Sequence, residues 1–335
     1  MSGAAVRFGI LGFGHHAGRR LVPAFARSTE AVLVGAWRRD QEALKGNCLE
    51  FGIAHAFRSR EEMCGSGDVE AVFITSPDAM HRDDALLAFA QGKAVLCEKP
   101  VAMNAGEAEE MASAATEAGV LYGVAQNFRW NRSLETMWEQ ILAGRIGEPQ
   151  MAHAEFAYPA QKAPRRWIAD ATLACGGPIA DVGVHCIDAL RFVLGREVET
   201  VSTVARKDAA SGEVDAVASL QMEMSGGLYA TVTVSARAAY RTLVEVTGTE
   251  GVLVAENGLT VDRPVEVVLL RGGEVVERKV LDNGDGYTRM LDDFAQALRG
   301  GKSFMASGTD GVTNMRVLDA AYSSWRSGRR ETVAG

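Results

Sequence analysis

The chain has 335 residues, of which 47% are hydrophobic and 23% are charged, and its formal net charge is −8. This length exceeds what one ordinary core holds and predicts two domains, while the normal apolar content excludes a disordered chain. The acidic balance excludes a general nucleic-acid binder, which would need a basic surface.

The sequence also indicates where the protein is located in the cell and whether its cysteines are reduced. No apolar stretch reaches the roughly 18 uncharged residues that a membrane span needs. No basic segment followed by a cleavable apolar run precedes the first strand, so we expect a cytoplasmic protein. Five cysteines without close pairs favour reduced thiols over a disulfide framework or a CxxC zinc site.

The first third of the chain alternates short, Val-rich apolar runs with helical patterns. Strands are expected at residues 6–11, 31–36, 69–75, 94–97 and 120–125. Helices are expected at residues 40–51, 81–91 and 104–118, the last of them capped by Asn104. This alternation predicts a doubly wound parallel sheet, a Rossmann-type α/β domain over residues 1–125.

The pattern changes over residues 126–335, where we expect an α+β domain with a large, mostly antiparallel open sheet. Helices are expected at residues 134–143 and 179–194. Strands are expected at residues 198–205, 216–224, 228–236, 243–246, 252–255, 265–270 and 275–281. Two last helices, 287–299 and 311–327, can pack back on the first domain.

A glycine-rich turn follows the first expected strand. It has the form G-x-G-x-x-A, with Gly12, Gly14 and Ala17. Gly12 permits a tight turn, Gly14 lets the backbone approach a pyrophosphate, and Ala17 lets the helix pack close to the strand. The helix N-terminus then offers its N–H groups to the phosphates. The pattern predicts a dinucleotide site, and the alternative is an ordinary tight β–α turn.

The end of the second expected strand bears on the choice of cofactor. It reads Trp37-Arg38-Arg39, with no acid to bind a ribose 2′-hydroxyl, and Asp40 is better placed as the N-cap of the next helix. The planar guanidinium of Arg38 could bind a 2′-phosphate. We therefore expect NADP(H) to be favoured, with NAD(H) possible; the alternative is a solvated arginine pair.

Two further segments carry ionisable side chains. Lys99 follows the strand at residues 94–97, and ligands of open parallel sheets sit at the carboxyl ends of strands. Its alternative is a surface Glu–Lys pair. On the helix at 179–194, Asp181, His185 and Asp188 share one face, which is typical of a proton-transfer group. The alternatives are a buried histidine with Asp181 as N-cap, or a metal site, which we do not expect because no third strong ligand stands at motif spacing.

Taken together, these segments resemble the glucose-fructose oxidoreductase / inositol dehydrogenase / MocA family over nearly the whole chain. The segments that carry the resemblance are 9–14, 74–78 with His81, 92–100, 144–149, 176–188, Tyr287 ahead of Asp293-Phe294, and 320–328. The combination of Glu-Lys-Pro at 98–100 with Asp-x-Gly-x-His-x-x-Asp at 181–188 is specific.

The resemblance implies roles for individual residues. Lys99 is similar to the family lysine that bonds the reacting oxygen, His185 to the acid/base, and Asp181 to the residue that holds the substrate. The expected cofactor contacts are Gly9, Gly12, Phe13, Gly14, His15, Trp37, Arg38, Arg39, Thr75, Ser76, Pro77, Asp78, His81, Glu98, Lys99, Trp167 and Tyr287. The expected substrate contacts are Lys99, Arg129, Trp167, Asp181 and His185. Three positions depart from the family pattern: Asp78 stands where Asn is usual, Ile168 where Arg is usual, and Trp37 is bulky.

The implied activity is hydride transfer between a nicotinamide and a hydroxyl or carbonyl carbon of a sugar, cyclitol or sugar derivative. The family also implies a homodimer or homotetramer formed through the exposed face of the second sheet. Two alternatives remain open: an NAD-dependent glycosidase that uses the cofactor transiently, and a non-catalytic dinucleotide-binding regulator.

Overall fold

The computed structural model of the chain describes residues 4–162 and 166–335. They form two units, the first from residues up to Ala125 with Tyr287–Thr313, and the second from Gln126–Gly286 with Asn314–Gly335. No helix in the described ranges is long and apolar enough to cross a membrane.

The first unit contains a six-stranded sheet in which all paired strands are parallel, so the predicted doubly wound sheet is confirmed. Its strands are β1 Val6–Leu11, β2 Ala31–Trp37, β3 His55–Ala56, β4 Ala71–Ile74, β5 Ala94–Cys97 and β6 Tyr122–Val124. They lie in the order β3-β2-β1-β4-β5-β6. The central strands β4 and β5 are buried throughout, as strands covered on both faces should be.

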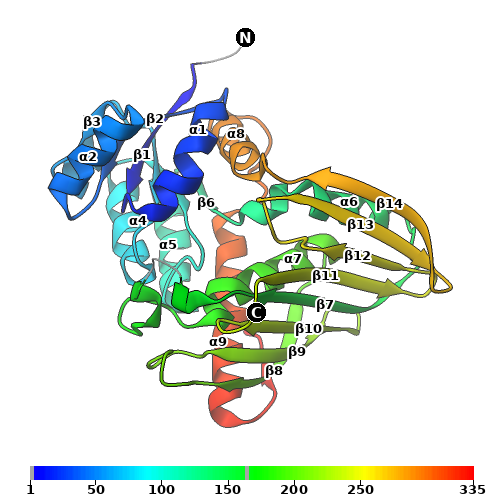
Figure 1. The fold of residues 1–335 in the computed structure, drawn as a ribbon. Coiled ribbons are helices and arrows are strands. Elements are labelled where there is room, and N and C mark those ends of the chain that lie inside the picture. Colours follow the sequence, from blue (N-terminus) through cyan, green and yellow to red (C-terminus); the bar gives the residue numbers. More distant parts are fainter. Residues whose placement is uncertain (1–3, 163–165) are drawn as a thin grey trace. The chain divides into compact units, whose positions relative to one another are not determined.

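Helices surround this sheet (Figure 1). They are η1 Ala17–Leu21, α1 Val22–Arg27, α2 Gln41–Phe51, α3 Arg60–Gly65, η2 Asp78–Met80, α4 His81–Ala90, α5 Ala105–Ala118 and α8 Gly286–Leu298. Phe8 on β1 packs against Phe294 on α8, with ring centroids 5.8 Å apart. Asn104 caps α5 by accepting from the Glu107 N–H, and Asp40 caps α2, so both predicted caps are confirmed. The sequence did not predict β3 or α3, which are too short to show a periodic pattern.

The second unit contains a nine-stranded sheet in the order β14-β13-β12-β11-β7-β10-β9-β8-β15. Its strands are β7 Pro149–Ala157, β8 Val198–Arg206, β9 Val217–Met224, β10 Leu228–Ser235, β11 Arg241–Gly248, β12 Val252–Glu256, β13 Pro264–Arg271, β14 Glu274–Asp282 and β15 Glu331–Thr332. Among the described strand pairings of this second sheet, only β7–β10 is parallel, which confirms the mostly antiparallel sheet.

One face of this sheet is covered by helices (Figure 1). The helices of the unit are η3 Asn127–Trp130, α6 Arg132–Leu142, η4 Ala160–Lys162, η5 Arg166–Ala169, η6 Ile179–Gly183, α7 Val184–Leu194 and the later turns of α9 Gly308–Ser327. α7 packs against β7 and β11, and α6 packs against β12, β13 and β14. Every residue of α7 except Phe192 is buried, so α7 is the central helix of this unit.

Candidate functional site

The turn after β1 depends on a glycine at position 12. Gly12 has a φ of +85°, and a Cβ there would lie 2.4 Å from the backbone nitrogen of Ser76, so only glycine fits without strain. The N–H groups of Gly12 and Phe13 donate to the carbonyl of Trp37 at 2.9 and 3.0 Å. The turn is thereby held between the ends of β2 and β4.

A pocket of about 400 Å³ adjoins this turn in the first unit. Its lining residues are Phe13, Gly14, His15, Gly18, Arg19, Arg38, Asn47 and Phe51. A Cβ built on Gly14 would meet only the Gly12 carbonyl oxygen, at 3.6 Å, so the backbone there is open to approach. Arg38 donates to the Asn47 side-chain oxygen at 3.1 Å, which fixes its guanidinium at the pocket wall. Small residues and arginines in one place fit the phosphates and ribose of a dinucleotide.

Three of the expected cofactor contacts, Gly9, Trp37 and Arg39, are not among the residues that line this pocket. Gly9 lies inside β1, where a Cβ would come within 2.8 Å of the Met63 sulfur, so this glycine makes room for Met63. The central carbon of the Arg60 guanidinium lies 5.9 Å from the centroid of the Trp37 ring. The Trp37 carbonyl accepts hydrogen bonds from the turn. Arg39 is exposed and does not line the pocket.

The loop after β4 is held by buried hydrogen bonds. The Ser76 hydroxyl donates to Asp84 at 2.6 Å, and the Thr75 hydroxyl lies 3.0 Å from the carbonyl oxygen of Gly12. The two ring nitrogens of His81 lie 2.9 Å from the carbonyl oxygens of Ser76 and Pro100. His81 therefore joins the loop to the Glu-Lys-Pro segment, and both of its ring nitrogens face backbone carbonyls.

Lys99 stands at the carboxyl end of β5 in a polar cluster. Glu98, beside it, lies 3.0 Å from the Nε2 of His16 and also accepts from the Lys99 N–H at 3.3 Å. Burial alone would raise the pKa of Glu98, but the charge and hydrogen bond of His16 hold that pKa below its ordinary value. The His16 ring meets Tyr287 edge-on at 5.9 Å. The first unit thus gathers the predicted Glu98, Lys99 and Tyr287, together with His16, which the sequence did not single out.

In the second unit, Asp181 and His185 form a buried group at the start of α7. Both are less than one-tenth exposed. The Tyr158 hydroxyl, just after β7, donates to the Asp181 carboxylate. The His185 ring packs against Phe128, with centroids 4.5 Å apart, and against Phe156 at 6.3 Å. The imidazole is therefore oriented by aromatic walls and the carboxylate by a phenol.

The expected single helical face with Asp188 needs correction. Residues Ile179–Gly183 form a π-helical turn, which changes the α-helical spacing before His185. Asp188 accepts from Arg129 at 2.9 and 2.7 Å and from Asn314 at 2.9 Å. The buried Arg129–Asp188 pair connects η3 to α7. Arg129 therefore has a structural role, whereas the sequence predicts it only as a substrate contact.

Asp215 anchors the beginning of the same segment. Its carboxylate accepts from the N–H groups of Gly177 and Ile179 at 2.8 and 2.9 Å and from the Tyr322 hydroxyl at 2.9 Å. Burial raises the pKa of Asp215, although these hydrogen bonds act against the rise. A Cβ on Gly177 would lie 2.0 Å from the Asp215 carbonyl oxygen, so the close approach requires glycine. Sequence reasoning missed Asp215 and Tyr158, since both act through contacts between distant segments.

Comparisons with known proteins agree on one family. Residues 6–126 match the oxidoreductase family with an NAD-binding Rossmann fold, and residues 134–254 match the GFO/IDH/MocA C-terminal domain. A 1,5-anhydro-D-fructose reductase of Ensifer adhaerens is 33% identical over 321 residues, or 94% of this chain and 96% of that protein. An inositol 2-dehydrogenase of Rhizobium meliloti is 28% identical over 98% of this chain and 99% of that protein. The structure of levoglucosan dehydrogenase with NADH and levoglucosan has the same fold, with a TM-score of 0.88 and 20% identity over 99% of this chain and 100% of that one.

The chain belongs to the GFO/IDH/MocA oxidoreductase family. The resemblance drawn from its motifs is thereby confirmed. As a GFO/IDH/MocA protein with an NAD-binding Rossmann domain, it is an NAD(P)-dependent enzyme of the dehydrogenase and reductase class. These relatives are named as reductases and dehydrogenases, which does not favour the glycosidase or the regulator.

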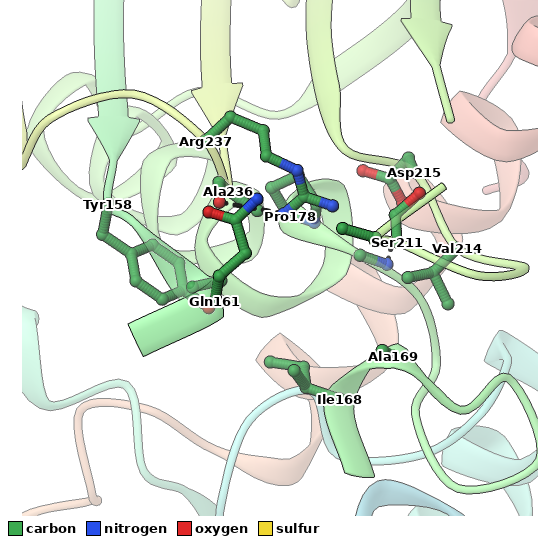
Figure 2. A pocket seen from close by; sticks show the side chains of 13 residues that line it. Tyr158, Gln161, Ile168, Ala169, Pro178, Ser211, Val214, Asp215, Ala236 and Arg237 are labelled. Carbon is green, nitrogen blue, oxygen red and sulfur yellow. Dashed lines mark hydrogen bonds between the residues drawn. The ribbon is translucent and has the colours of Figure 1, made fainter. Parts of the chain in front are cut away.

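This GFO/IDH/MocA chain also has a pocket of about 280 Å³, and every described residue that lines it belongs to the second unit. Tyr158 lines it and bonds Asp181, and Gly177 and Pro178 line it just ahead of η6 (Figure 2). Ile168, which departs from the family pattern, lines it as well, next to the half-buried Trp167. The pocket therefore adjoins the residues expected to handle the substrate.

Proposed function

We propose that this enzyme interconverts a hydroxyl-bearing and a carbonyl carbon of a sugar, cyclitol or sugar derivative. The observation that carries the proposal is the hydrogen bond from the half-buried Tyr158 to the buried Asp181, four residues ahead of the buried His185. An imidazole oriented by aromatic side chains is suited to proton transfer at neutral pH. The relatives named for an anhydro sugar and an inositol support this substrate class.

The roles of the side chains follow from their chemistry. A nicotinamide dinucleotide, when bound, supplies the hydride transfer that no side chain can perform. In the oxidation direction, His185 takes the proton of the substrate hydroxyl; in reduction it returns a proton to the same oxygen. In the first unit, the role proposed for the Lys99 ammonium is to stabilise negative charge on a reacting oxygen. Asp181, held by Tyr158, orients the substrate.

NADP(H) is the favoured cofactor in this proposal. Arg19 and Arg38 both line the pocket beside the glycine turn. β2 ends without an acid, and Asp40 is occupied as the cap of α2. A ribose 2′-phosphate would find cationic partners there, while a 2′-hydroxyl would find no carboxylate.

We also propose that the enzyme self-associates through the open face of its nine-stranded sheet. Met151 on β7 and Tyr229 on β10 are paired neighbours and are 58% and 60% exposed. Large apolar side chains in the middle of an exposed sheet are typical of an interface.

Replacing Lys99 tests the reaction. A panel of sugars and cyclitols is followed at the NADPH absorbance with the full chain. For the best substrate, Lys99→Met should lower kcat by about 10²–10⁴-fold, because the oxygen loses its cationic partner. Binding of NADP(H), measured by thermal shift, should persist.

The matched control is Lys45→Met, since Lys45 is an exposed lysine of α2. It should leave kcat unchanged. A Lys99→Met enzyme that keeps most of its turnover would refute the role of Lys99, and absence of turnover with the whole panel would refute the substrate class.

A further inference from the structure

The pocket beside Tyr158 has a predominantly apolar wall. The apolar residues that line it are Ala160, Ile168, Ala169, Gly177, Pro178, Ala210, Val214 and Ala236. Figure 2 shows Ile168 and Ala169 on one side of the space, with Ser211, Val214 and Asp215 on another. Its volume of about 280 Å³ is near the lower end of the range for ligand sites, which fits one ring or a compact substituent.

The two charged residues among the described lining already have protein partners. Arg237 donates through Nε and Nη2 to Asp208, at 2.7 Å for each bond, and through Nη1 to the Ala236 carbonyl at 3.0 Å. The hydrogen bond from Arg237 lowers the pKa of Asp208 to about 2, so this pair stays charged at any ordinary working pH. Asp215 is held by Gly177, Ile179 and Tyr322, as described above.

The uncharged polar side chains of the lining differ from each other in their hydrogen bonding. The Ser211 hydroxyl bonds the backbone of Asp208, donating to its carbonyl at 3.0 Å and accepting from its N–H at 2.9 Å. Gln161, an exposed residue, contributes an amide that can both donate and accept. A ligand in this pocket therefore meets apolar surface and an amide, while Arg237 is paired with Asp208 and Asp215 already accepts hydrogen bonds from the protein.

We propose that this pocket binds the part of the substrate that extends beyond the reacting carbon, and that it selects an uncharged group with an apolar face, such as the aryl or branched alkyl substituent of a neutral glycoside. The inference rests on the proposed function, because Tyr158 links the pocket to Asp181. A carboxylate or phosphate in the same place would lose its hydration without gaining a cation, which is unfavourable. Uronates and phosphorylated sugars are thus disfavoured by this site.

Calorimetric titration of the full chain with two matched probes tests the inference. The probes are phenyl β-D-glucopyranoside and 4-carboxyphenyl β-D-glucopyranoside, which differ in one carboxylate on the aryl group. The neutral probe should bind about tenfold more tightly or better. Ile168→Arg places a guanidinium in the pocket and should reduce this preference about tenfold or more. Leu142→Arg, the same type of change at a 68% exposed position on α6, should leave the preference unchanged.

A second variant tests the pocket in case Ile168→Arg does not fold. Ala169 is exposed at the pocket, so Ala169→Trp can fill the space without disturbing the core, and it should weaken binding of both probes. The inference is overturned if neither probe binds, if both bind equally, or if Ile168→Arg leaves the preference intact in a protein with wild-type thermal unfolding. These titrations need no turnover. A failure of this inference can therefore be distinguished from a failure of the redox proposal, which would appear as no change in NADPH absorbance.

Discussion

At the scale of single residues, Arg38 offers the sharpest test of cofactor choice. Arg38 lines the pocket beside the glycine turn, whereas its neighbour Arg39 is exposed and does not. Arg38→Ala should weaken NADP⁺ binding by about tenfold or more, because a 2′-phosphate loses a planar cationic partner. NAD⁺ binding should change far less. Fluorescence titration of both nucleotides measures the difference.

The adjacent arginine provides the control for this prediction. Arg39→Ala should leave the affinity for both nucleotides near wild type. A wild-type enzyme that binds NAD(H) more tightly than NADP(H) would contradict the proposed preference before any variant is made.

Residue-level prediction from sequence succeeds where a motif has a local physical reason. Gly12 is recognisable because a tight turn needs its backbone, and the structure has it at positive φ. His16 and Tyr158 were missed for the opposite reason. Their partners, Glu98 and Asp181, lie 82 and 23 residues away, and no spacing rule connects them.

At the scale of secondary-structure elements, the segment from Gly177 through α7 is positioned by a carboxylate from another part of the chain. Asp215→Asn keeps the shape of that side chain but removes its charge and one of its acceptors. We expect kcat to fall by about tenfold or more, since Asp181 and His185 lie on this segment and small displacements are costly. The unfolding free energy should fall by about 1–3 kcal/mol. Steady-state kinetics across pH and thermal unfolding measure both.

Tyr322→Phe is the graded control for that change. It removes one hydrogen bond to Asp215 and leaves both backbone contacts, so its effect on kcat should be smaller. If Asp215→Asn instead keeps the wild-type kcat and pH profile, Asp215 does not position the catalytic segment.

Some elements were not predicted from the sequence, and the physical reasons can be identified. β7 lies at the centre of the second sheet, yet its inward residues are Ala152, Ala154 and Phe156, and small alanines give a weak alternating signal. The π-helical turn before α7 has no distinctive composition, because the extra residue per turn is set by packing. Short, largely buried strands such as β1 and β5 were predicted with their observed bounds.

At the scale of the whole molecule, the open sheet face predicts self-association. Met151→Glu with Tyr229→Glu should shift the particle toward the mass of one chain in light scattering, because charges replace apolar surface. Leu142→Glu, at an exposed position of α6, is the matched control and should leave the mass unchanged. A wild-type protein with the mass of a single chain would contradict the proposal.

The division of the chain between the units has a consequence for how such enzymes can be recombined. The first unit needs Tyr287–Thr313, whose Phe294 packs on Phe8, and the second needs Asn314–Gly335, whose Tyr322 bonds Asp215. A gene fragment that stops at Ala125 would therefore encode an incomplete cofactor half. Exchanging cofactor specificity between homologues requires two crossovers around the distal stretch as well as one at residue 125, and chimaeras made with a single crossover should fold poorly.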